Sequence, residues 1–188
     1  MASTSLLGLS GSLRADSFST GILTTLQAEL AGDIELIIHS LAEVPLYNQD
    51  LDGAAPPRKV AALRDAIAAA DGLVIVTPEF NYGIPGVLKN ALDWASRPYG
   101  TSSLIGKPVV TMSTSPAFTG GVRAQAQLHE TLLATQSVIV PRPQTVIGEV
   151  HNKFADGRLV DQMTLEFALS AVADLQGFIH GRPTRLAA

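Results

Sequence analysis

The chain has 188 residues, enough for one domain with a sizeable core. Hydrophobic residues make up 46% and charged residues 16%, a composition too apolar for a disordered chain. The formal net charge of −4 gives no reason to expect binding to nucleic acid or to an anionic membrane surface. Because there are no cysteines, disulfides, thiolate catalysis, zinc–cysteine sites and iron–sulfur clusters are excluded, and redox chemistry would need a bound cofactor.

The N-terminal segment Met1 to Leu9 lacks the basic and long apolar regions of a signal peptide. The longest apolar runs, such as Gly72–Thr77, are far shorter than the ~20 residues of a membrane helix. We therefore expect a cytoplasmic protein with no membrane association. The histidines are widely separated and show no ligand spacing, so no metal site is expected.

Short aliphatic runs alternate with helical patterns along the whole chain. The runs are apolar at consecutive positions, which is typical of strands covered on both faces. The pattern predicts an α/β fold, a doubly wound five-stranded parallel sheet with helices on both faces, in a single domain over residues 1–188. The expected strands are Thr4–Leu9, Ile34–Ile38, Leu73–Thr77, Pro108–Ser113 and Val138–Val140. The expected helices lie near Ser17–Ala31, Pro57–Ala70, Pro85–Arg97, Gly121–Ala134 and Asp161–His180, and Pro141–Gly157 is expected to be a longer loop.

Ligands of such sheets bind at the carboxyl ends of the strands, where the loops after the first, third and fourth strands meet. The first loop, Ser10–Thr20, offers five hydroxyls, a glycine and Arg14 at the start of a helix, which suits an anion. A single Ser or Thr capping the helix is the plainer alternative. The spacing of Gly8 and Gly11 does not fit a dinucleotide-binding G-x-G-x-x-G, and Gly8-Leu9-Ser10-Gly11 lacks the last glycine of a hydrolase nucleophile elbow.

The loop after the third strand, Thr77–Gly86, is stiffened by two prolines and carries an aromatic pair and an asparagine. It suits the edge of a flat heteroaromatic ring, although a stiff surface turn is the alternative. Ser113–Arg123, after the fourth strand, again combines hydroxyls, glycines and a proline. Together the three loops predict a pocket with an anion end and a planar-ring end.

The predicted helix Pro85–Arg97 carries Lys89, Asp93 and Arg97 at spacings of four. The simplest interpretation is a row of ion pairs along one helix face. Trp94, the one tryptophan, is expected to pack in the core or at an interface rather than to take part in chemistry.

Three stretches of the sequence form a recognisable set of motifs: Gly11-Ser12-Leu13-Arg14-x-x-Ser17, then Thr77-Pro78-Glu79-Phe80-Asn81-Tyr82, and Pro85-Gly86-Val87-Leu88-Lys89-Asn90-Ala91-Leu92-Asp93-Trp94. They resemble the NADPH-dependent FMN reductase family, and within it the bacterial chromate, quinone and ferric reductases. The segment at the start of the fourth predicted helix, Gly120-Gly121-Val122-Arg123-Ala124-Gln125, is similar to the same group of reductases. The resemblance covers effectively the whole chain and implies a flavodoxin-like fold of strand order 2-1-3-4-5, tightly bound FMN, NADH or NADPH as co-substrate, and a homodimer or homotetramer.

The resemblance also implies a site. Ser12, Arg14, Ser17 and Ser19 would hold the phosphate, together with Leu13 and Phe18 of the same loop; Pro78, Glu79, Phe80 and Asn81 would border the isoalloxazine, and Thr114 and Ser115 would complete the site. The family usually has Asn where this chain has Ser19, and Ser115-Pro116-Ala117-Phe118 is bulkier than usual.

The expected activity is a ping-pong transfer from NADH or NADPH to FMN and on to quinones, ferric complexes, chromate or similar acceptors. The flavin carries the chemistry, so no catalytic acid or base is expected. Arg97 and Tyr82 are the candidates for binding substrate, and Arg97 would hold an anionic group of the substrate, either in its own chain or across a dimer interface. The alternatives are an FMN electron carrier of the flavodoxin type and, less well supported, a hydrolase using Ser10.

Overall fold

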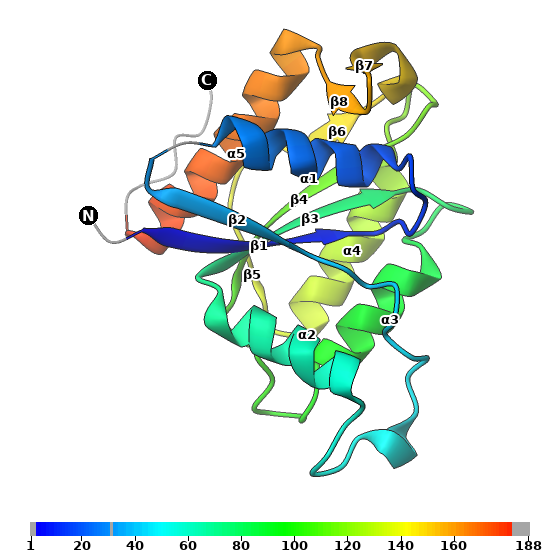
Figure 1. Ribbon diagram of the computed structural model, residues 1–188, viewed down its shortest axis with the longest axis vertical. Helices are drawn as coiled ribbons and strands as arrows, with labels where there is room; N and C mark the ends of the chain where they lie inside the picture. Colours follow the sequence, from blue (N-terminus) through cyan, green and yellow to red (C-terminus); the bar gives the residue numbers. More distant parts are fainter. Residues whose placement is uncertain (1–2, 31, 182–188) are drawn as a thin grey trace.

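A central parallel sheet organises the computed structural model, which describes residues 3–30 and 32–181 (Figure 1). Its strands run in the order β2-β1-β3-β4-β5, so the predicted order 2-1-3-4-5 is confirmed. In the middle of the sheet Gly8 of β1 lies between Ile38 of β2 and Val74 of β3. The strands are β1 (Thr4–Ser10), β2 (Ile34–His39), β3 (Gly72–Pro78), β4 (Pro108–Thr114) and β5 (Val138–Ile139).

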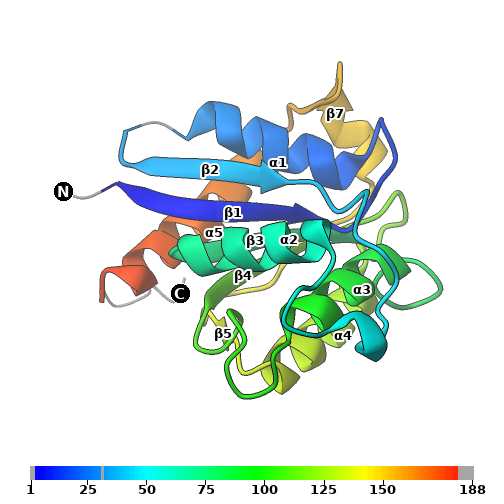
Figure 2. The ribbon, with the colours of Figure 1, turned by 60° about the horizontal axis from the view of Figure 1, so that its bottom comes forward.

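Helices cover both faces of this sheet, as Figures 1 and 2 show. Side chains alternate between the faces along each strand. Leu6 and Val74 therefore pack with α1 (Phe18–Glu29) and α5 (Gln162–Ile179) in one core cluster. Leu7 and Ile75 pack on the other face with three helices, α2 (Arg58–Ala69), α3 (Gly86–Ala95) and α4 (Val122–Ala134). None of the helices in the described part of the chain is long and apolar enough to cross a membrane.

The fifth strand is interrupted, a feature that was not predicted from the sequence. After β5 the chain leaves the sheet and returns as β6 (Thr145–Ile147), which pairs in parallel with the carboxyl half of β4. Pro141 and Pro143 lie in the gap, and neither has an N–H to donate to a ladder. The sheet therefore has six strands rather than the expected five.

A small hairpin occupies part of the segment expected to be a loop. After the short helix η2 (Val150–Lys153), β7 (Phe154–Ala155) pairs antiparallel with β8 (Arg158–Leu159). Asp156 and Gly157 form the turn with φ of +49° and +75°, the left-handed conformation that two-residue hairpins prefer. The hairpin lies over α1 (Figure 1).

Two helices end about two residues earlier than predicted. The helix expected to reach Arg97 ends at Ala95, because Pro98 disfavours helical backbone in the residue before it. The first helix ends at Glu29, and Ala31 lies outside the described residues. Another short helix, η1 (Gln49–Leu51), lies in the loop before α2. These differences leave the loops at the carboxyl edge of the sheet where they were predicted.

Candidate functional site

The loops after β1, β3 and β4 meet at the carboxyl edge of the sheet and enclose a cavity of about 450 Å³. Ten of the twelve residues predicted to bind the cofactor line this cavity. Leu13 and Asn81 do not line it, and Pro116 was not predicted. The lining is Ser12, Arg14, Ser17, Phe18, Ser19, Pro78, Glu79, Phe80, Thr114, Ser115 and Pro116.

The first loop is fixed by its own hydroxyls and by a close approach to β3. Ser17 caps α1, its Oγ accepting from the N–H of Thr20 at 3.3 Å. The hydroxyls of Ser10 and Thr20 lie 2.9 Å apart. At Gly11 a Cβ would come within 2.8 Å of Thr77 Oγ1, so only glycine lets the loop lie this close to β3. The loop is thus held with the N-terminus of a twelve-residue helix at the cavity, which favours an anionic group.

Arg14 supplies the positive charge of this end of the cavity. Its guanidinium lies 5.9 Å from the centroid of the Phe18 ring and donates to the backbone oxygen of Asp16. The side chain is exposed and makes no ion pair within residues 3–30 and 32–181. Arg14 is therefore available to a phosphate in the cavity.

Two buried hydroxyls in the cavity wall have no hydrogen-bond partner among the described residues. They are Ser19 Oγ on α1 and Thr114 Oγ1 at the end of β4, and the residues are 1% and 2% exposed. An unsatisfied buried polar group costs about 1–3 kcal/mol, so such groups need an explanation. A polar ligand reaching both elements would satisfy the two hydroxyls. A flavin nucleotide, with its phosphate, its ribityl hydroxyls and its polar ring edge, fits this donor and acceptor set.

The end of the cavity that was predicted to border a planar ring is formed by a tight turn in the loop after β3. Phe80 and Gly83 exchange backbone hydrogen bonds of 3.0 and 2.9 Å. Asn81 and Tyr82 between them have φ of +50° and +66°. The turn places Phe80 at the cavity and Tyr82 outside it, where the guanidinium of Arg123 lies 4.1 Å from the centre of the tyrosine ring.

Glu79 has a structural contact that sequence reasoning missed. Its Oε2 accepts the backbone N–H groups of Arg123 and Ala124 at 3.0 and 3.1 Å. These are orphan donors of α4, whose N-cap is Gly121 with no side-chain hydrogen bond. The carboxylate thus stabilises the helix N-terminus and ties the third loop to the fourth. The partners are 44 and 45 residues apart in sequence, and no local pattern indicates them.

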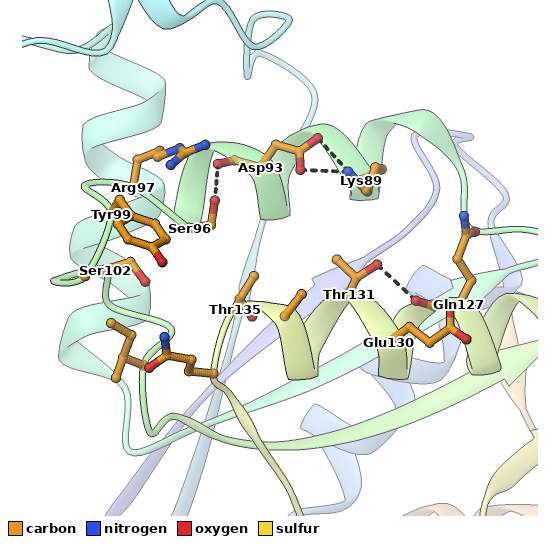
Figure 3. A pocket seen from close by; sticks show the side chains of 14 residues that line it. Lys89, Asp93, Ser96, Arg97, Tyr99, Ser102, Gln127, Glu130, Thr131 and Thr135 are labelled. Carbon is orange, nitrogen blue, oxygen red and sulfur yellow. Dashed lines mark hydrogen bonds and ion pairs between the residues drawn. The ribbon is translucent and has the colours of Figure 1, made fainter.

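Arg97 lines a different cavity, of about 480 Å³, between the end of α3 and α4 (Figure 3). Lys89 and Asp93 form the predicted ion pair at 2.8 Å, but the row does not extend to Arg97, whose guanidinium lies 6.0 Å from the Tyr47 ring. The Nε of Arg97 is buried and has no partner in the described part of the chain. Within one chain, neither Arg97 nor Tyr82 lines the predicted cofactor cavity.

Trp94 packs inside the chain. It is fully buried, its Nε1 donates to the backbone oxygen of Pro45 at 2.8 Å, and its ring meets that of Tyr47 edge-on at 4.8 Å. Of the two expected roles, core packing is the correct one. Trp94 therefore gives no support for an interface.

The strand order 2-1-3-4-5 and a cavity for a flavin nucleotide at the carboxyl edge define a flavodoxin-like flavoprotein. The sequence pattern of the NADPH-dependent FMN reductases matches residues 4–152. The chain belongs to the NADPH-dependent FMN reductase family.

Several known proteins are similar over nearly their full length. The quinone reductase of Escherichia coli K12 is 37% identical over 175 residues, covering 91% of this chain and 93% of its own. The 2-hydroxy-1,4-benzoquinone reductase of a Burkholderia species is 39% identical over 158 residues, covering 84% and 86%. The structure of FerB, a flavoenzyme NAD(P)H:(acceptor) oxidoreductase from Paracoccus denitrificans, matches with a TM-score of 0.85 at 35% identity, covering 95% and 98%.

These similarities confirm four predictions made from the sequence: the family, the flavodoxin-like fold, the oxidoreductase class, and FMN with NAD(P)H. The chain is an NAD(P)H:acceptor oxidoreductase. This decides against the electron-carrier and hydrolase alternatives.

Proposed function

We propose that this chain reduces quinones with electrons from NADH or NADPH, using FMN held in the cavity at the carboxyl edge of the sheet. The observation that carries the proposal is the pair of buried hydroxyls of Ser19 and Thr114, which lie in the wall of that cavity without partners among the described residues. When bound, FMN supplies the chemistry by accepting a hydride from the nicotinamide and delivering electrons to the acceptor.

The protein binds and orients the cofactor. At the anion end, Arg14 contributes a charge-assisted hydrogen bond to the phosphate, and the hydroxyls and backbone N–H groups of the first loop surround it. Ser19 fills the place of the family's asparagine with a shorter donor. The residues proposed for the phosphate end are Ser12, Leu13, Arg14, Ser17, Phe18 and Ser19.

At the other end of the cavity, the loops after β3 and β4 are held rigidly around the proposed position of the flavin ring. Glu79 is held against α4 and Pro78 ends β3, so the two loops keep a fixed separation. Phe80 is 61% exposed at the rim and offers an aromatic face to a planar acceptor. The residues proposed for the ring end are Pro78, Glu79, Phe80, Asn81, Thr114 and Ser115, with Tyr82 on the acceptor side.

Quinones are the acceptors named for the Escherichia coli and Burkholderia relatives. Phe80 at the rim is exposed, so the ring end of the proposed site is open to acceptors of different shape. We therefore extend the proposal to ferric complexes and chromate as further acceptors. The same proposal takes residues 1–188 as one FMN-binding domain that works in the cytoplasm.

We also propose that the chain works as a homodimer or homotetramer, with Arg97 reaching the substrate of a second copy. The cavity between α3 and α4 supports this, because it presents Arg97 beside Tyr99, which is 83% exposed (Figure 3). Light scattering that finds only monomer at micromolar concentration would refute the assembly.

Anaerobic stopped-flow absorbance tests the activity. The yellow holoprotein is mixed with NADH or NADPH, and the flavin absorbance is expected to bleach within the dead time or as a single fast phase. A quinone added in a second mixing step is expected to restore it. Flavin that neither nucleotide bleaches would refute the proposal, and so would reduced flavin that no quinone reoxidises.

A further inference from the structure

A polar side chain bonds to β4 at the point where the fifth strand is interrupted. Thr111 lies between the part of β4 that pairs with β5 and the part that pairs with β6. Before the interruption, the backbone oxygen of Val109 accepts the N–H of Val140 at 3.0 Å. The backbone oxygen of Thr111, the next on the same side of the strand, accepts from Nε2 of Gln125 at 3.1 Å. Gln125 of α4 therefore takes the place of a neighbouring strand at this point in the sheet.

The partners of the Gln125 amide fix its orientation. A backbone oxygen can only accept a hydrogen bond, so the nitrogen of the amide faces Thr111. The amide oxygen then faces Ser113 and accepts its hydroxyl at 3.3 Å. Nε2 also lies 3.1 Å from Oγ1 of Thr111. Gln125 and Ser113 are 1% and 0% exposed, so a polar group left without its partner here would be costly.

These bonds join the two ends of the loop after β4. The loop covers residues 115–121, between the end of β4 and the start of α4. Gln125 lies in the first turn of α4, and Ser113 lies one residue before the end of β4. The bonds therefore set the spacing between the strand that enters the loop and the helix that leaves it. Thr114 and Ser115, which line the cofactor cavity, lie where the loop begins.

The outer side of the same loop is held by other contacts. The backbone oxygen of Ser115 accepts the N–H of Val150 at 3.2 Å, and that of Ala117 accepts the N–H of Glu149 at 3.2 Å. These contacts come from the segment after β6 and do not involve Gln125. We therefore expect replacement of Gln125 to leave the loop folded and to change its position between β4 and α4.

We propose that Gln125 is a positioning residue for the flavin, which holds Thr114 and Ser115 at the ring end of the cofactor. The inference rests on the proposed function, because it needs a flavin in the cavity at the carboxyl edge of the sheet. Gln125 does not line that cavity, so it acts through β4 and the loop. The phosphate end is formed by the loop after β1, and the bonds of Gln125 go to β4. A change at Gln125 therefore weakens binding of the ring and leaves the contribution of the phosphate intact.

Titration of the apoprotein with riboflavin and with FMN tests the assignment, because only FMN carries the phosphate. The test variant is Gln125→Met, which keeps the length of the side chain and removes its hydrogen bonds. The matched control is Leu128→Ala on the same helix, because Leu128 is fully buried in the core on that face of the sheet. This control destabilises the fold by opening a cavity and leaves the bonds of Gln125 in place. A second variant, Ser113→Ala, removes one of these bonds and carries the test if Gln125→Met does not fold.

Gln125→Met is expected to raise the Kd for riboflavin and for FMN by the same factor, about tenfold. The absorbance spectrum of its bound flavin is expected to move towards that of free flavin. Ser113→Ala is expected to raise both Kd values about threefold, and to add nothing in the Gln125→Met background, because both changes release the same contact. Leu128→Ala is expected to lower the Tm of the apoprotein and to leave both Kd values and the spectrum unchanged.

Unchanged riboflavin and FMN affinities in Gln125→Met, or in Ser113→Ala where Gln125→Met does not fold, would overturn the inference alone. So would a loss of affinity for FMN without one for riboflavin, because the effect would then lie at the phosphate. Leu128→Ala weakening both flavins as much as Gln125→Met would assign the effect to general stability and also overturn the inference. A parent apoprotein that binds neither flavin would refute the proposed function, and the inference with it.

Discussion

Replacing Ser19 by alanine is expected to move two measurements in opposite directions. In the apoprotein the Ser19 hydroxyl is buried without a partner among the described residues, so it carries a desolvation cost that nothing repays. Its removal should raise the free energy of unfolding by about 1 kcal/mol, which for a chain of this size raises the Tm by roughly 2–4 °C. The same change should weaken FMN binding, because a hydrogen bond to a charged group contributes about 1.5–3 kcal/mol, or roughly ten- to a hundredfold in Kd.

Differential scanning calorimetry of the apoprotein and a calorimetric titration with FMN measure the two effects on the same variant. Ser103→Ala is the matched control, because Ser103 Oγ is also buried and unpartnered in the described part of the chain but lies outside the cavity. That control should stabilise the apoprotein and leave the Kd for FMN unchanged.

Two results would refute the reasoning. A Ser19→Ala apoprotein that is less stable than the parent would show that the hydroxyl is satisfied by the protein itself. An unchanged Kd for FMN would show that the hydroxyl does not face the cofactor. Only the combination of a more stable apoprotein and a weaker holoprotein supports Ser19 as the replacement for the family's asparagine.

The positions of strands and helices were predictable because apolar runs covered on both faces leave a strong pattern in the sequence, whereas the strand order followed from the family resemblance. The interruption of the fifth strand was not, because it depends on contacts far along the chain. Arg142, between the two prolines, donates to Asp174 at 3.0 Å and to Ser170 at 3.1 Å on α5. Its guanidinium also lies 5.0 Å from the Phe167 ring. These contacts hold the chain away from the sheet between β5 and β6.

The cofactor cavity was predictable because parallel strands bring their carboxyl ends to one edge, so the loops could be assigned before any distance was known. What remained hidden were contacts between loops. Glu79 was expected to border a ring, and its bonds to the N-terminus of α4 depend on how two loops cross. Arg97 follows a helix that starts beside the cavity, yet α3 carries it about 14–17 Å away from that start at 1.5 Å per residue. Arg97 is therefore too far from the start of α3 to line the cofactor cavity within one chain.

Three further outcomes are expected. Arg14→Ala should raise the Kd for FMN by roughly ten- to a hundredfold, because it removes a charge-assisted bond to the phosphate, and a variant that purifies with full flavin would contradict this. Arg97→Ala should slow flavin reduction by NADH or NADPH about tenfold, a loss of about 1.4 kcal/mol of substrate positioning, with flavin content and Tm unchanged; an unchanged rate would return Arg97 to a structural role. The third concerns pH. Burial lowers the pKa of His129, whose Nε2 lies 2.7 Å from Thr111 Oγ1, so the unfolded chain binds this proton more readily than the folded one. Stability should therefore fall as pH drops below about 6.5 and level off below the lowered pKa, because the slope has the sign of the extra protons bound on unfolding. The pKa of His39 is also lowered, by burial and by Lys59, and contributes a slope of the same sign. Urea unfolding of the parent and of His129→Gln between pH 7.5 and 5 isolates the His129 share, and parallel curves for the two would show that His129 titrates alike in the folded and unfolded states.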